Sequence, residues 1–159
     1  MRIQELGFAI RQERVTQGMT QARLARASGI SRVTLNQLES GLFPDLGIRK
    51  VGALLKNLGL ELAVVKPERL GPDFIAMAST SASVSFRESL AEEELIRILL
   101  SGKVPANRRA HMRALLDEAS PAMMRGLMEE VGRWTKPGRA EKNLAAIAKA
   151  LGTTRKIQK

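Results

Sequence analysis

Residues 19–41, MTQARLARASGISRVTLNQLESG, decide the fold of the N-terminal half of the chain. Thr20 offers a side-chain oxygen to the free amides of a helix start, and residues 21–28 then carry apolar side chains at helical spacing. Gly29 tolerates positive φ, so it ends this helix and turns the chain sharply. Ser31 caps a second helix. Two short helices that meet across a turn built on one glycine predict a helix-turn-helix.

The second helix should expose its polar side chains on the face opposite its buried leucines. Such side chains match the base edges of duplex DNA, because Arg forks onto guanine, Gln or Asn onto adenine, and Val or Thr methyls contact the thymine methyl. An ordinary solvated face has a similar composition, but the order of residues across the whole stretch favours DNA contact. The base-reading candidates are Ser31, Arg32, Val33, Thr34 and Gln37, with Asn36 as a phosphate-binding candidate beside them.

The order Thr-Gln, Leu-Ala, Gly-Ile-Ser, Thr-Leu and Leu-Glu-x-Gly within residues 19–41 resembles the Xre and lambdoid-repressor family of helix-turn-helix proteins. The resemblance extends over about Leu6 to Val65. Its last part, Leu60-Glu-Leu-Ala-Val-Val65, is similar to HipB-type antitoxins in particular. The implied fold is a mainly α-helical N-terminal bundle of four helices.

The resemblance also implies roles for individual residues. Gln21 is expected to meet a phosphate at the start of the second helix. Arg14 and Glu39 are expected to form a structural ion pair that ties the first helix to the third. The implied base-reading residues are Ser31, Arg32, Val33 and Gln37.

HipB-like proteins bind a toxin and repress their own operon, so the resemblance implies a toxin partner and an operator in double-stranded DNA. A stand-alone Xre-type regulator, whose C-terminal half binds an effector or a protein, is the nearer alternative. A protein whose helix-turn-helix docks another protein is a further alternative. The base-capable Arg32 and Gln37 speak against it.

Two more helices are expected in the N-terminal domain, residues 1–69. Apolar spacing predicts the first over Ile3 to about Thr16, and a fourth that begins at Ile48. Arg49 and Lys50 would lie in the first turn of that fourth helix, where positive charge opposes the helix dipole. This misfit makes both residues candidates for phosphate contact, with a solvated surface as the alternative.

The pattern changes from helical to extended after the fourth helix, which predicts a short strand over Leu60 to Val65. A single strand leaves its amides unpaired, so the simplest arrangement pairs it with the same strand of a second copy. A strand docked on its own chain is the alternative. The second helix of the motif, which carries the base-reading candidates, is called here the reading helix. A homodimer would place two reading helices about 34 Å apart on an inverted repeat. The predicted dimer contacts are Leu60, Leu62 and Val64.

The remaining chain divides into a predicted linker and a second domain. Residues 70–85 are small, polar and punctuated by proline, which favours a linker. Residues 86–159 show helical periodicity and predict a small domain of about four short helices. Ser89 with Glu92 should form a capping box, and Ser120-Pro121 should be a cap followed by a first-turn proline. The pattern assigns this domain no function.

Composition limits the classes of partner. The formal charge is +10, and each half carries +5, so a polyanion such as DNA or an acidic membrane surface is expected as a partner. Aromatic residues make up only 3% of the chain, which disfavours stacking on single-stranded nucleic acid. The sequence has no cysteine, no signal peptide and no long apolar run, so we expect a cytoplasmic protein that spans no membrane.

Residues with catalytic or metal-binding chemistry are few. His111 is the one histidine, and we expect it at the surface among arginines. The three carboxylates of Glu92, Glu93 and Glu94 fit the first turn of a helix, where they favour its dipole. No phosphate-binding glycine loop occurs. We therefore expect no metal, no cofactor and no enzymatic activity.

Overall fold

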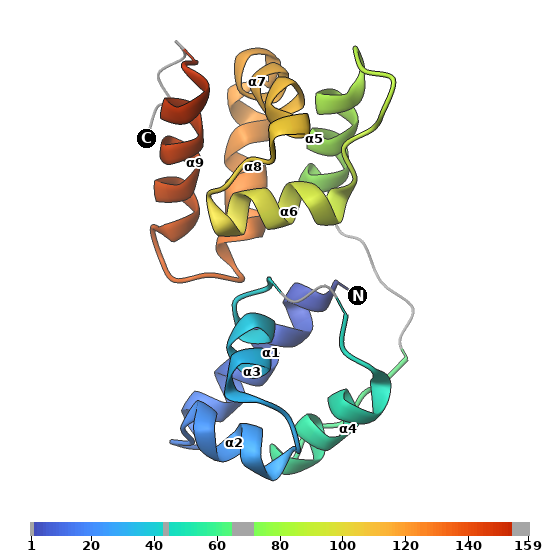
Figure 1. The fold of residues 1–159 in the computed structure, drawn as a ribbon, viewed down its shortest axis with the longest axis vertical. Coiled ribbons are helices and arrows are strands. Elements are labelled where there is room, and N and C mark those ends of the chain that lie inside the picture. Colours follow the sequence, from blue (N-terminus) through green and yellow to red (C-terminus); the bar gives the residue numbers. More distant parts are fainter. Residues whose placement is uncertain (1, 43–44, 65–71, 154–159) are drawn as a thin grey trace. The chain divides into compact units, whose positions relative to one another are not determined.

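The computed structural model describes residues 2–42, 45–64 and 72–153, and among these it shows helices and no strand. The chain forms two compact units, Met1–Arg69 and Leu70–Lys159, which are called here the N-terminal unit and the C-terminal unit (Figure 1). None of the described helices has the length and apolar character needed to cross a bilayer.

The N-terminal unit is a bundle of short helices around one apolar core. Helix α1 packs against α3, and α2 packs against both α3 and α4. The core side chains with no exposed surface include Ile10, Leu24, Leu35, Leu38 and Leu54. The helix bounds are α1 Ile3–Thr16, α2 Gln21–Ala27, α3 Arg32–Glu39 and α4 Ile48–Asn57.

Local hydrogen bonds fix the turn between α2 and α3. The Thr20 hydroxyl accepts from the Arg23 amide at 3.2 Å, and the Ser31 hydroxyl accepts from the Thr34 amide at 2.9 Å. Between these caps Gly29 has a φ of +66°, the left-handed conformation that favours glycine. The predicted caps and the predicted glycine turn are therefore confirmed.

Helix α1 lies close against the α3 backbone at Gly7. A Cβ atom built on Gly7 would lie 2.0 Å from the backbone oxygen of Leu38. Because that oxygen belongs to the α3 backbone, it cannot move aside as a flexible side chain would. Gly7 therefore sets the spacing of the two helices.

The C-terminal unit contains five α-helices and one short 3-10 helix among its described residues (Figure 1). Helix α5 packs against α6, α7 and α8, and α9 packs against the same three helices. The bounds are α5 Phe74–Ser83, α6 Glu92–Ser101, the 3-10 helix Ala106–Arg108, α7 Arg109–Glu118, α8 Pro121–Gly132 and α9 Arg139–Leu151.

Helix α5 corrects the prediction that residues 70–85 are a linker. Its small residues resemble a linker in composition, but Ala78 and Ala82 are fully buried and let α5 pack closely against its neighbours. The Asp73 carboxylate caps the helix by accepting from the Ala76 amide at 3.0 Å. Glu130 of α8 also accepts from the Ile75 amide, at 3.1 Å. Burial and caps thus turn a weakly helical sequence into a core helix.

The predicted strand at Leu60–Val65 is wrong over its described residues, 60–64. Leu60 donates its amide to the Leu55 carbonyl at 2.9 Å and packs against the helical core. Beyond it Leu62 is 46% exposed and Val64 is fully exposed, with no neighbouring strand in the described chain. A strand needs a partner for its amides, and this segment has none here. Val65 lies outside the described residues.

The helix starts of the C-terminal unit follow the sequence in one case and depart from it in another. Ser120 accepts from the Met123 amide at 3.1 Å, and Pro121 occupies the first turn of α8, as predicted. The predicted capping box of Ser89 and Glu92 does not form, because α6 begins after Ala91 without a side-chain cap.

His111 is buried, which corrects its predicted surface position. Its exposed fraction is 5%, and its Nε2 atom lies 2.7 Å from the Glu88 carbonyl oxygen. The imidazole also stacks on Phe86, with ring centroids 4.1 Å apart. Residues 86–90 therefore fold over α7 and cover a side chain that sequence alone placed among solvated arginines.

We predict that Gly7→Ala destabilises the N-terminal unit by about 1 to 3 kcal/mol, because the added methyl forces α1 away from the α3 backbone. Unfolding followed by far-ultraviolet circular dichroism measures this change. Gly52→Ala is the matched control. Gly52 lies in α4 with open space around its Cβ position, so alanine there should raise stability by roughly 0.5 to 1 kcal/mol. Equal effects of the two substitutions would contradict the proposed contact.

Candidate nucleic-acid interface

Helix α3 separates a buried side from a side that is open to solvent. Leu35 and Leu38 have no exposed surface and anchor the helix to the core. Val33 is 65% exposed, a large fraction for a branched apolar side chain. The exposed face of α3 carries Arg32, Val33, Asn36 and Gln37. The structure therefore places four of the predicted DNA-contacting residues side by side.

Ser31 and Thr34 fix the beginning of this face. The Ser31 hydroxyl accepts from the Thr34 amide and lies 2.8 Å from the Thr34 hydroxyl. Both hydroxyls are thus engaged with each other in the free protein. They can still accept or donate outward, since a hydroxyl has two acceptor sites and one donor. Their first contribution is to hold the α3 N-terminus in one conformation.

Gln21 links α2 to α3 through its side-chain amide. Its Nε2 atom donates to Glu39 Oε2 at 2.9 Å and lies 3.4 Å from Asn36 Oδ1. A phosphate oxygen would need a hydrogen-bond donor. The side-chain Nε2 of Gln21 already donates to Asn36 and Glu39 within the protein. The free backbone amides at the start of α2 could donate to a phosphate instead. The phosphate contact at Gln21 stays a prediction.

Arg14 and Glu39 form the ion pair that the resemblance implied. Arg14 Nε donates to Glu39 Oε1 at 2.6 Å, and Arg14 Nη2 donates to Glu39 Oε2 at 2.8 Å. Arg14 Nη1 donates to the Met19 carbonyl at 2.7 Å. The exposed fractions of the Arg14 and Glu39 side chains are 11% and 3%. The hydrogen bonds to Glu39 raise the pKa of Arg14 above its ordinary value, so Arg14 stays charged at every accessible pH.

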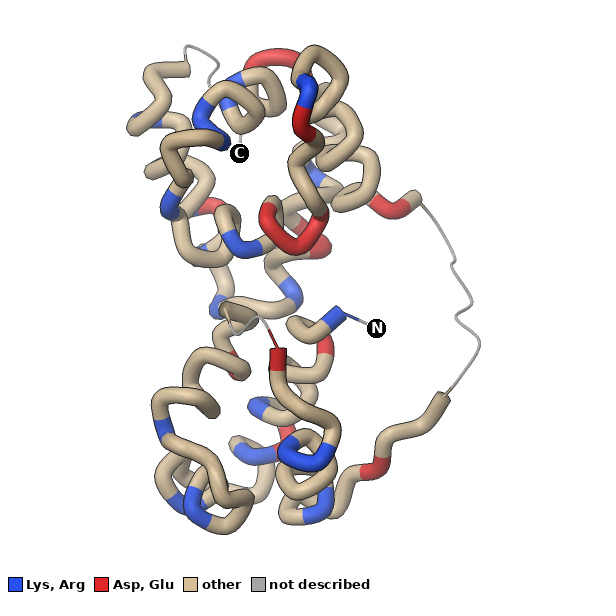
Figure 2. Tube along the Cα trace, turned by 45° about the vertical axis from the view of Figure 1, so that its right-hand side comes forward, with Lys and Arg blue, Asp and Glu red and all other residues tan. Residues whose placement is uncertain are grey.

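Arg49 and Lys50 occupy the first turn of α4 and are exposed, as the sequence predicted. This turn has Gly47 at its N-cap and no side-chain cap. Helix α4 packs against α2. Arg49 and Lys50 therefore belong to a different helix from the exposed face of α3. Figure 2 shows further Lys and Arg positions along the N-terminal unit, and Arg23 and Arg26 of α2 are among the exposed ones.

Two amide side chains that the sequence reasoning missed join other helices of the N-terminal unit. Asn57 donates from Nδ2 to the Ala27 carbonyl at 3.2 Å and lies 3.2 Å from the Ser28 hydroxyl, which joins the end of α4 to the end of α2. Gln17 donates to the Leu58 carbonyl at 2.8 Å. Asn and Gln at helix ends are common, so the sequence carried no signal for these long-range bonds.

Comparison with known proteins agrees with this geometry. Residues 10–65 match the family model described as Helix-turn-helix, which is of the Xre and lambda-repressor type. The match spans the second half of α1 and all of α2, α3 and α4, so this part of the chain is a helix-turn-helix domain. It indicates a sequence-specific DNA-binding regulator of transcription. No curated protein and no solved structure matches the chain.

We predict that Arg14→Met lowers the stability of the chain by about 3 kcal/mol, because it leaves the Glu39 carboxylate buried without its cation. Arg14→Lys should lose less, since a lysine keeps the charge but cannot form the forked pair and also reach the Met19 carbonyl. Chemical unfolding of both variants measures the difference. If the lysine variant were as stable as the wild type, the forked geometry would be irrelevant, and if it were as unstable as the methionine variant, the retained charge would contribute nothing.

Proposed function

We propose that the chain is a transcriptional repressor that binds an inverted repeat in double-stranded DNA as a homodimer. The observation that carries this proposal is the exposed face of α3. This helix is capped by Ser31 and is held to the core by the buried side chains of Leu35 and Leu38. In the proposed mechanism Arg32 and Gln37 read base edges, and Ser31, Val33 and Thr34 assist them. Gln21, Asn36, Arg49 and Lys50 position the unit on the phosphates.

The dimer follows from the size of the reading helix. Helix α3 has eight residues, so one copy contacts only a few base pairs. Two copies related by a twofold axis would read two half-sites about one helical turn apart. Leu62 and Val64 are exposed apolar side chains that a second copy could cover. This contact does not require the residues to form a strand.

We further propose that the chain is the antitoxin and autoregulator of a type II toxin–antitoxin operon in the cytoplasm, and that it acts by binding rather than by catalysis. The similarity of the segment after α4 to HipB-type antitoxins supports this narrower role. A toxin would be its second protein partner.

A stand-alone regulator is the second candidate. The C-terminal unit favours it, because this unit has its own core and lies outside the region that matches the helix-turn-helix family. A separate folded unit of this kind can bind an effector or another protein. In that case no toxin would be encoded beside the gene.

Binding sites selected from a randomised duplex library test the reading helix. We predict that Arg32→Ala loses discrimination at one base pair of each half-site, worth about 1 to 3 kcal/mol. Gln21→Ala should instead weaken binding to all sequences alike, because it disturbs the phosphate-facing start of α2. Titration of selected and scrambled duplexes with each variant gives the comparison. Equal losses on both duplexes for both variants would refute these roles.

Sedimentation of the full chain tests the dimer. We predict that replacing both Leu62 and Val64 with Asp shifts the population towards monomer and weakens binding to a two-half-site duplex. Single-half-site binding should be unchanged, because neither residue lies on α3. Met77→Asp is the control, since Met77 is also exposed and apolar but lies in α5 of the other unit. An unchanged sedimentation profile for the double variant would remove these residues from the interface.

The antitoxin role has its own test. A reading frame next to this gene should arrest growth when expressed alone, and co-expression of this chain should restore growth. Failure to find such a neighbour would favour the stand-alone regulator.

A further inference from the structure

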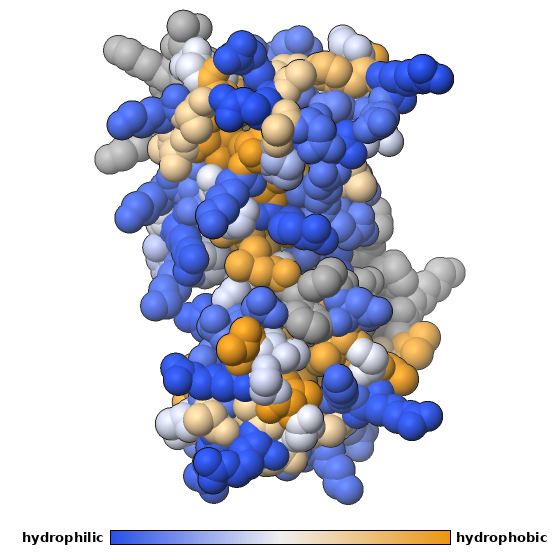
Figure 3. Space-filling model, in the orientation of Figure 1, coloured by the Kyte–Doolittle hydropathy of each residue, from blue (hydrophilic) through white to orange (hydrophobic). Residues whose placement is uncertain are grey.

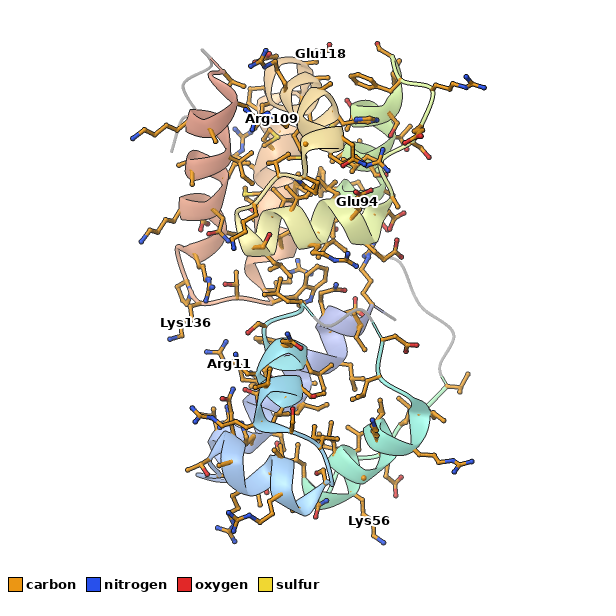
Figure 4. The ribbon with its side chains drawn as sticks, viewed as in Figure 1. Arg11, Lys56, Glu94, Arg109, Glu118 and Lys136 are labelled. Carbon is orange, nitrogen blue, oxygen red and sulfur yellow. The ribbon has the colours of Figure 1, made fainter. Side chains whose placement is uncertain are left out.

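The C-terminal unit is divided into an acidic part and a basic part. Residues 73–94 contain five acids and one arginine, whereas residues 133–149 contain five cations and one acid, Glu141. The acidic part covers α5 and the first turn of α6, and the basic part covers the connection after α8 and most of α9. In Figure 4 the labelled Glu94 and Lys136 lie on opposite sides of the unit.

Helix α6 explains this separation, because it runs from α5 to α9. Near its start the Leu90 carbonyl accepts from Ser79 of α5, and at its end the Leu99 and Leu100 carbonyls accept from Asn143 of α9. Its first turn therefore carries Glu92, Glu93 and Glu94 on the α5 side, where Figure 2 shows one continuous acidic turn. On the side near α9, Glu141 is the one acid among residues 133–149.

Four exposed cations come together where α9 begins. Arg139 and Lys142 are three residues apart and share a face of α9. The Arg139 amide donates to the Lys136 carbonyl at 3.0 Å, which places Lys136 in the preceding turn. Lys103 follows Gly102, whose added Cβ would lie 3.1 Å from Asn143 Oδ1 in the second turn of α9. These four residues, Lys103, Lys136, Arg139 and Lys142, are called here the basic surface.

The basic surface carries a net positive charge, since Glu141 is the one acid among residues 133–149. None of its four cations forms an ion pair with a described residue, whereas Arg108 near the acidic part pairs with Glu94 at 2.9 Å. Figure 3 shows hydrophilic side chains projecting along the α9 edge of the unit. Four unpaired like charges repel one another, so a polyanion would bind here favourably.

We infer that the basic surface binds the phosphate backbone of duplex DNA without reading its sequence. This inference rests on the proposed function, because DNA held by the N-terminal unit raises the effective concentration of duplex at a unit on the same chain. Each phosphate that a cation neutralises releases counterions, and this release provides the affinity.

The exposed residues around the basic surface distinguish duplex DNA from other polyanions. Membrane binding is strengthened by apolar anchors among the basic residues. The large exposed apolar side chains described in this unit are Met77 and Val84, at α5, and only alanines are exposed on α9 beside its charges. Single-stranded nucleic acid needs exposed aromatic rings, but Trp134 is only 7% exposed. The regular array of phosphates of duplex DNA fits a surface of exposed cations without apolar or aromatic anchors.

The test measures binding of the full chain to a random-sequence duplex between about 50 and 200 mM salt. The variant carries both Arg139→Gln and Lys142→Gln, and its control carries Arg87→Gln and Arg125→Gln, two exposed cations elsewhere in the same unit. Over this range the wild type and the control should lose about tenfold more affinity than the variant, since the variant lacks two phosphate contacts. All four positions are exposed, so Trp134 fluorescence should show an unchanged fold.

The outcomes separate this inference from the proposed function. If the wild type binds no duplex at any salt concentration, the proposed function fails. If the wild type prefers its selected site but the Arg139→Gln/Lys142→Gln variant keeps the full salt dependence, only the inference fails. Gln37→Ala should show the opposite pattern, with weaker preference and unchanged salt dependence. If the double variant instead loses binding to phosphatidylserine–phosphatidylcholine vesicles and not to duplex, the surface is a membrane surface and the inference is overturned.

Discussion

The forked ion pair between Arg14 and Glu39 is the interaction on which the N-terminal unit depends. Arg14 lies near the end of α1, and its guanidinium reaches both the last residue of α3 and the Met19 carbonyl before α2. Gln21 adds a bond from α2 to the same carboxylate. One nearly buried Glu39 side chain therefore joins three helices, and its own charge is paired beneath the α3 surface.

This arrangement matters because α3 is too short to be stable alone. A helix of eight residues has a costly nucleus and few internal hydrogen bonds, so its conformation depends on the packing of Leu35 and Leu38 and on the Ser31 cap. The buried side of α3 provides the packing that stabilises the helix, and the exposed side chains contribute little to that stability. Base-contacting residues can then differ between proteins without loss of the fold, which is how one scaffold serves many operators.

What the sequence predicted, and what it did not, follows from the range of the interactions. Thr20, Gly29 and Ser31 act on amides a few residues away, so their pattern was sufficient to predict the turn. The linker and strand predictions failed because they depended on distant partners. Ala78 and Ala82 look like linker residues until helices pack against them, and Leu62 and Val64 alternate like a strand but find none beside them. The burial of His111 similarly depends on residues 86–90, which no local rule places over α7.

The distribution of charge and specificity over the two units has a kinetic consequence. In the proposed function, base contacts from Arg32 and Gln37 would distinguish one site from another, whereas phosphate contacts would strengthen binding to every sequence alike. Cations on a second unit would therefore leave the ratio of specific to nonspecific affinity unchanged. They would lengthen each nonspecific encounter and so favour search along the duplex. A regulator with one short reading helix per copy gains residence time on DNA in this way, without placing further charge beside the bases that it must distinguish.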